Sequence, residues 1–91
     1  MFLARYLQIS VQSIIPLTMH ISQARAILNS REACDIHYWT SKGEQQVALG
    51  AVSLSYDTRT GTRNIKILSS GQVRRIRDVC IFMLNDEEVY I

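Results

Sequence analysis

The spacing of apolar residues changes along the chain, and its first part reads as a strand. Leu7, Ile9 and Val11 alternate with polar residues, a period of two that is typical of a half-buried strand, and Pro16 ends the pattern. We therefore predict an N-terminal extension over residues 1–18 that contains one strand, followed by a single domain over residues 19–91.

A different period begins at Ile21. Apolar residues recur at three- and four-residue steps as far as Leu28, which predicts a helix over residues 21–29. The rest of the chain alternates in the manner of strands. Residues 73–84 fit either a helix or a strand, and their β-branched residues favour the strand.

Glycine and asparagine mark the breaks between strands. Val47 and Leu49 are followed by Val52 and Leu54, so the alternation slips by one residue at Gly50 and predicts a bulge there. A two-residue turn is expected at residues 85–86. The predicted core has these members: Ile27, Leu28, Ile36, Tyr38, Val52, Leu54, Ile65, Ile67, Ile81 and Val89.

These elements predict a mainly β (α+β) fold. About five short strands with tight turns are typical of a small, strongly bent antiparallel sheet or an SH3-like, partly open barrel. One short helix covers an end of it, and the N-terminal strand is extra. A chain of 91 residues has room for one such core.

Composition excludes some classes of protein. Hydrophobic residues make up 47% of the chain and charged residues 20%, too apolar for a disordered chain, and the net charge of +2 is small for a dedicated nucleic-acid binder. The apolar stretches are too short and too interrupted for a signal peptide or a membrane span. We expect a cytoplasmic protein in which Cys34 and Cys80 are reduced thiols.

Candidate catalytic and metal-binding residues do not converge. Cys34 and His37 have a C-x-x-H spacing, but residues three apart on a strand face opposite sides. The neighbours Glu87 and Glu88 diverge in the same way, and the glycines lack the spacing of a phosphate-binding loop. We expect no enzyme, no metal, no cofactor and no small-molecule substrate.

Basic residues are concentrated over residues 59–77, a stretch without acids. Arg75 and Arg77 share one face of a strand, whereas Arg74 projects to the other. Two interpretations are open. The basic face is solvated and paired with the acidic strand near residues 86–88, or it contacts nucleic acid. The candidate nucleic-acid-binding residues are Arg59, Arg63, Lys66, Arg75, Arg77 and Trp39.

Trp39 lies on the same face as His37, opposite the apolar positions of its strand, so the alternation predicts an outward indole that can stack on unpaired bases. The alternative is that Trp39 packs beneath the helix or the N-terminal strand.

Two segments, "SREACDIHYWTSKGE" and "GTRNIKILSSGQVRRIRDVCIFMLNDEEVYI", resemble a family of short proteins encoded in phages and mobile elements of gut bacteria. The resemblance covers residues 30–91 and rests on a strand that ends in an aromatic residue, a glycine-centred turn and a closing hairpin. The family has no established activity, so the resemblance implies a setting and assigns no functional residue.

Two functional hypotheses follow. The first is a non-enzymatic binding module that contacts nucleic acid through the basic strand. The second is a protein-interaction or assembly module of a phage or mobile element, in which Leu7, Ile9 and Val11 pair with the sheet edge of another copy and form a homo-oligomer.

Overall fold

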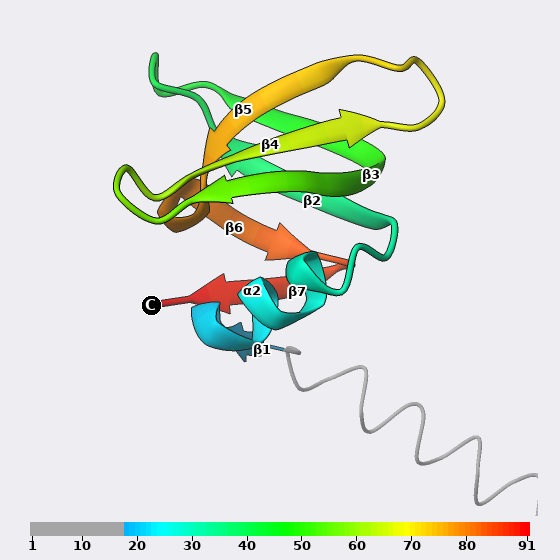
Figure 1. The fold of residues 1–91 in the computed structure, drawn as a ribbon. Helices are drawn as coiled ribbons and strands as arrows, with labels where there is room; N and C mark the ends of the chain where they lie inside the picture. The colour runs from blue at the N-terminus through cyan, green and yellow to red at the C-terminus, as the bar shows by residue number, and fades with distance from the viewer. Residues whose placement is uncertain (1–17) are drawn as a thin grey trace, which may run out of the picture.

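The computed structural model describes residues 18–91, which form one strongly curved, mixed β-sheet with a single short helix (Figure 1). The elements are β1 (Thr18–His20), α2 (Ile21–Asn29), β2 (Cys34–Trp39), β3 (Gln45–Asp57), β4 (Thr62–Ile67), β5 (Val73–Arg77), the 3-10 turn η1 (Asp78–Cys80), β6 (Ile81–Leu84) and β7 (Glu87–Tyr90). The strand order across the sheet is β1-β7-β6-β2-β3-β4-β5.

The mainly β prediction is confirmed, but its finer form is not. The sheet has seven strands where about five were expected, and β1 runs parallel to β7, so the sheet is mixed. Its ends, β1 and β5, are not paired with each other, so the sheet is not closed, and the predicted SH3-like, partly open barrel of about five strands is not confirmed (Figure 1). A strand as short as β1 could not be recognised from the alternation of apolar and polar residues, because three residues are too few to show a period of two.

β1 contains a residue that the prediction assigned to the extension. Thr18 pairs with Glu88 of β7 and so belongs to the sheet. The strand predicted around Leu7, Ile9 and Val11 lies outside the described residues.

α2 matches the predicted helix over residues 21–29. A reciprocal capping box closes its N-terminus. The Ser22 amide donates to His20 Nδ1 at 3.1 Å, and the His20 amide donates to Gln23 Oε1 at 3.0 Å. Its buried side chains are those of Ile21, Ala24 and Leu28. Within residues 18–91, no helix has the length and apolar character needed to cross a membrane.

A bulge in β3 lies where the sequence predicted it. Cys34 of β2 pairs with Ala51 and Ile36 pairs with Ala48, so β3 has one residue more than β2 over this stretch. Gly50 takes up the extra residue with φ of +60°, and its amide donates to the Asp35 carboxylate at 2.9 Å. The sheet bends here.

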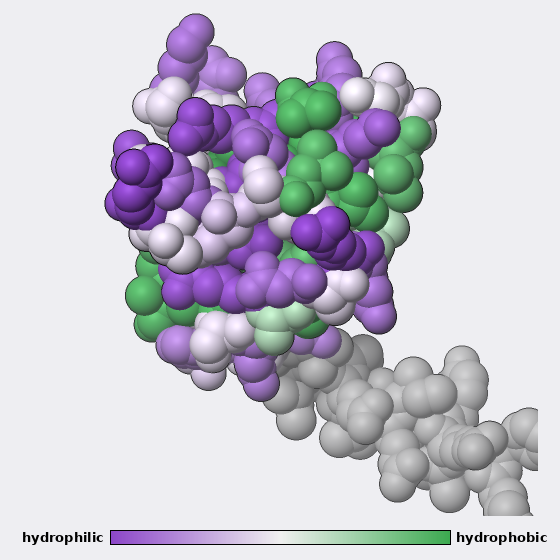
Figure 2. Space-filling model, in the orientation of Figure 1, coloured by the Kyte–Doolittle hydropathy of each residue, from purple (hydrophilic) through white to green (hydrophobic). Residues whose placement is uncertain are grey.

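The prediction of which β3 side chains face the core was wrong, because the buried positions are shifted by one residue along the strand. The buried side chains of the strand are those of Ala48, Ala51 and Ser53. The larger Val47, Leu49 and Leu54 are exposed, and Val52 is only half-buried, so Leu54 and Val52 do not belong to the buried core. Figure 2 shows apolar side chains gathered on the surface over β3, β4 and β5.

The remaining core predictions agree with the structure. The buried members are Leu28, Ile36, Tyr38, Ile65, Ile67 and Ile81, and Ile27 and Val89 pack against them. The strand interpretation of residues 73–84 is confirmed, with η1 turning the chain between β5 and β6. Asn85 and Asp86 have φ of 49° and 66°, as a tight hairpin turn with two left-handed residues requires.

Candidate nucleic-acid interface

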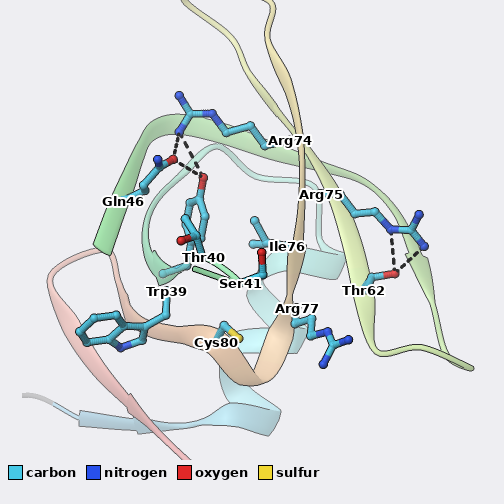
Figure 3. Close-up of a pocket in the computed structure, with 11 residues that line it drawn as sticks. Trp39, Thr40, Ser41, Gln46, Thr62, Arg74, Arg75, Ile76, Arg77 and Cys80 are labelled. Atoms are coloured by element: carbon cyan, nitrogen blue, oxygen red, sulfur yellow. Dashed lines mark hydrogen bonds between the residues drawn. The ribbon is translucent and has the colours of Figure 1, made fainter. Parts of the chain in front are cut away.

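A cleft of about 650 Å³ opens between the edge strand β5 and the β2–β3 hairpin (Figure 3). We call it the arginine cleft. It is lined by Tyr38, Trp39, Thr40, Ser41 and Gln46 from the hairpin, by Thr62 from β4, and by Arg74, Arg75, Ile76, Arg77 and Cys80 from β5 and η1. Three guanidinium groups and two aromatic side chains therefore border one hollow.

The position of β5 at the end of the sheet lets all three arginines border one opening. Arg74 and Ile76 face the concave side, opposite Ile65 and Arg63 of β4, whereas Arg75 and Arg77 face the other side. In a central strand these faces would be separated by the sheet. At an edge, both faces border the same opening, so side chains that alternate can line one cleft.

Arg74 was not among the predicted nucleic-acid-binding residues, but its side chain is the most buried of the three arginines. Its Nη1 donates to the Tyr38 hydroxyl at 3.2 Å and to Gln46 Oε1 at 3.4 Å (Figure 3). Its Nη2 donates to Gln72 Oε1 at 3.2 Å. All three acceptors are neutral. The side chain is thus held in place while its charge is not neutralised by a carboxylate.

The other two arginines are exposed and also have no acidic partner among residues 18–91. Nε and Nη2 of Arg75 donate to the Thr62 hydroxyl at 3.3 and 3.1 Å (Figure 3). Among residues 18–91 the ion pairs are Arg25–Asp78, Arg59–Asp57 and Arg63–Asp78, so none involves a cleft arginine. Three uncompensated positive charges along one strand attract an anion.

Ion pairing of the basic strand with the acidic strand, one of the two interpretations above, does not occur in this sheet. Glu87 and Glu88 belong to β7, which lies between β1 and β6 at the far end of the strand order. Among the described strands, β5 has β4 as its single neighbour. The segregation of charge along the sequence is therefore also a segregation in space.

Arg63 is a correction to the predicted site. Its side chain is 1% exposed, and Nε and Nη2 donate to Oδ1 and Oδ2 of Asp78, both at 2.9 Å. Nη1 donates to Asn29 Oδ1 at 2.8 Å and to the Ser53 hydroxyl at 2.9 Å. The guanidinium also lies 4.7 Å from the centre of the Tyr56 ring. A side chain enclosed in this way cannot contact a nucleic acid. The sequence signal was Asp78, the acid that closes the basic stretch.

Two further predicted residues lie outside the cleft. Arg59 is in the turn between β3 and β4, where its Nε lies 3.5 Å from the Asp57 carboxylate. Lys66 is on the outer face of β4, paired across the sheet with Val52 and Val73. Of the six predicted residues, Arg75, Arg77 and Trp39 line the cleft.

Trp39 is 43% exposed, so the predicted outward indole is confirmed. The rings of Trp39 and Phe82 pack with their centroids 5.5 Å apart. The His37 ring also packs edge-on against the Phe82 ring, with centroids 5.9 Å apart. The indole extends from the rim of the cleft away from the arginines (Figure 3). It offers an exposed aromatic surface beside the opening and does not fill it.

The cysteines and histidines do not assemble into a catalytic or metal centre in the described part of the chain. Cys34 is buried and its Sγ donates to the Glu32 carbonyl at 3.2 Å, while His37 lies on the opposite face of β2. Burial raises the pKa of the Cys34 thiol, which opposes thiolate formation. No group of three His, Cys, Asp or Glu residues within 18–91 is placed to hold a metal ion.

The cleft lining combines guanidinium, hydroxyl, amide and aromatic groups, with Cys80 at its margin. Such a set can hold an anion and contact flat rings, and it supplies no pair of titrating acid and base side chains. Comparison of the chain with models of protein families, with curated proteins and with solved structures finds no match.

Proposed function

We propose that the protein is a non-enzymatic module that binds nucleic acid through the arginine cleft. The observation that carries the proposal is that Arg74, Arg75 and Arg77 follow along the edge strand that borders this opening, and that no ion pair among residues 18–91 involves them. Guanidinium groups bind phosphate oxygens through paired, charge-assisted hydrogen bonds. A ligand with successive phosphates uses all three charges at once.

The aromatic rim favours a single strand over a duplex. Trp39 is exposed beside the cleft, and Phe82 supports its ring from behind. Bases in a duplex are stacked on each other and cannot reach such a surface, whereas unpaired bases stack on aromatic rings with little dependence on sequence. The proposed contact residues are Arg74, Arg75, Arg77 and Trp39, while Lys66 and Arg59 have no assigned role.

The test is the salt dependence of binding to a fluorescent 20-nucleotide single strand. Replacing Arg75 and Arg77 by Gln removes two phosphate contacts, so affinity falls for every sequence and the slope of log K against log salt decreases by about 1.4. The control is Arg31→Asn, which removes an exposed charge at a residue that lines neither the cleft nor the neighbouring hollow that Arg59 and Arg75 share. Equal affinity in the cleft variant and the wild type rejects the proposal.

A second candidate function is assembly by strand pairing. The observation that favours it is the open sheet, since β1 and β5 each have one neighbour among the described strands. An unpaired edge is a template for another strand, and the alternating segment with Leu7, Ile9 and Val11 is the candidate partner. Oligomeric state measured with and without that segment separates this function from nucleic-acid binding.

A further inference from the structure

The hydrogen-bond register of β5 shows which of its backbone groups are unpaired. The Ile67 amide donates to the Gln72 carbonyl at 2.8 Å, and the Asp78 amide donates to the Gly61 carbonyl at 3.1 Å. Between these two bonds, antiparallel pairing alternates, so every second residue of β5 turns its N–H and C=O toward β4. The intervening residues Val73, Arg75 and Arg77 turn both groups to the free edge.

Two of these three residues belong to the arginine cleft. Arg75 and Arg77 are among the residues that border it, and β5 has no strand on its other side in the described part of the chain. The hairpin across the cleft contributes Thr40 and Ser41 to the lining and forms no backbone hydrogen bond with β5. The N–H and C=O of Arg75 therefore form an adjacent donor and acceptor on the side of β5 that has no paired strand among residues 18–91.

We propose, as a deepening of the proposed function and resting on it, that this edge binds the Watson–Crick edges of unpaired bases. Every nucleic-acid base has at least one hydrogen-bond donor next to an acceptor along that edge. The backbone of Arg75 offers the complementary pair, just as it would to a neighbouring strand. The substrate class is single-stranded nucleic acid of any sequence.

Charge decides between this ligand and another protein strand. A second copy that paired through its own β5 would bring Arg75 and Arg77 against the same arginines, which is repulsive. A nucleic-acid strand carries phosphates that the guanidinium groups neutralise, and its bases lie within reach of the strand edge. An acidic extended peptide is the competing ligand, and the experiment below includes it.

The protein test compares Arg75→Gln with Arg75→Pro. Both variants lose the guanidinium, and only the proline variant also loses the N–H. That N–H is not used by β4, and an edge strand tolerates proline at such a position. We expect binding of a single-stranded oligonucleotide to be about 3- to 10-fold weaker in Arg75→Pro than in Arg75→Gln, the range of one hydrogen bond. Thermal melting of both variants checks the fold.

The ligand test uses the wild-type protein and needs no variant to fold. Oligothymidylate is compared with the same strand carrying N3-methylthymine, which blocks the Watson–Crick donor, and with oligodeoxyuridylate, which lacks only the C5 methyl group. We expect the N3-methylated strand to bind at least about 3-fold more weakly and the uridylate strand to bind equally well.

The outcomes separate the two proposals. If the Arg75/Arg77 double variant loses affinity while the proline variant matches the glutamine variant and N3-methylation has no effect, the phosphate cleft stands and the strand-edge contact is overturned. If poly-glutamate binds more tightly than the oligonucleotide and depends on the Arg75 N–H, the edge belongs to an acidic peptide instead. If the double variant binds as the wild type does, both proposals fail.

Discussion

Arg63 and Asp78 form a bidentate ion pair in the interior, with Nε–Oδ1 and Nη2–Oδ2 both at 2.9 Å. The pair joins β4 to η1, and α2 joins it through Arg25, whose Nε donates to Asp78 Oδ2 at 3.3 Å, and through Asn29. Every buried side-chain nitrogen and oxygen in the described residues has a hydrogen-bond partner. The pair therefore fixes the turn between β5 and β6, which also places one end of the arginine cleft.

Breaking this ion pair should destabilise the fold strongly. Asp78→Ala leaves the Arg63 charge buried without its partner, and we expect a loss of about 3 to 5 kcal/mol in the free energy of unfolding, measured by urea denaturation. The double variant Arg63→Met with Asp78→Leu should be more stable than Asp78→Ala, because neither charge remains. If the double variant lost as much free energy of unfolding as Arg63→Met and Asp78→Leu lose together as single variants, the two residues would not interact.

The shifted face of β3 gives a direct comparison of two aliphatic residues. Ile65→Ala should lower the free energy of unfolding by about 2 to 4 kcal/mol, because its side chain is fully buried. Leu54→Ala should cost less than about 1 kcal/mol, because that side chain is 41% exposed. Chemical denaturation of both variants measures the difference. Equal losses would show that Leu54 packs in the core after all.

The two thiols should differ in reactivity. Cys80 is half-buried at the margin of the cleft and should react with a thiol reagent in the native protein, whereas Cys34 is buried and should react only on unfolding. Peptide mapping after alkylation assigns the modified cysteine. Modification of Cys34 at the rate of Cys80 would contradict its burial.

The raised pKa of Cys34 has a consequence for stability at high pH. In the unfolded chain the thiol deprotonates near its ordinary value of 9.0, while in the folded protein burial keeps it protonated. The unfolded state then binds fewer protons, so the free energy of unfolding is unaffected below pH 9 and falls as the pH rises above it. The variant Cys34→Ala should lack this component, and unfolding curves at pH 8 and pH 10 measure it.

Trp39 should contribute to binding by stacking. Trp39→Ala should weaken binding of a single-stranded oligonucleotide by about 1 to 3 kcal/mol, the range for one base on an aromatic ring, measured by fluorescence anisotropy. Leu49→Ala is the control, because Leu49 is 62% exposed and does not line the cleft. A loss of the same size in both variants would mean that an apolar surface, and not stacking, is the cause.

Removal of residues 1–15 should leave the fold intact and reduce self-association. The described residues have a core of their own, so the thermal unfolding temperature should change little. The shortened chain must keep Thr18 and Met19, since Thr18 pairs with Glu88 and Met19 is buried. Light scattering on both chains measures the oligomeric state. A full-length protein that is monomeric at high concentration would remove the support for assembly.

Local features of this protein could be read from the sequence because they depend on neighbouring residues. The helix over residues 21–29, the bulge at Gly50 and the left-handed turn at residues 85–86 follow from apolar spacing and from the conformations that glycine and asparagine adopt. The alternation of β2 also placed Cys34, Ile36 and Tyr38 inside and Trp39 outside. Each of these depends on contacts within a few residues.

The face of β3 and the content of the cleft were decided by tertiary structure. β3 has apolar residues on both sides, so its pattern marked the slip at Gly50 without showing which side the bend would enclose. The burial of Arg63 required Asp78 to be placed beside it, and the entry of Arg74 into the cleft required β5 to be the last strand of the sheet. Strand order is set by which apolar faces pack together over the whole chain, and no local spacing contains that information.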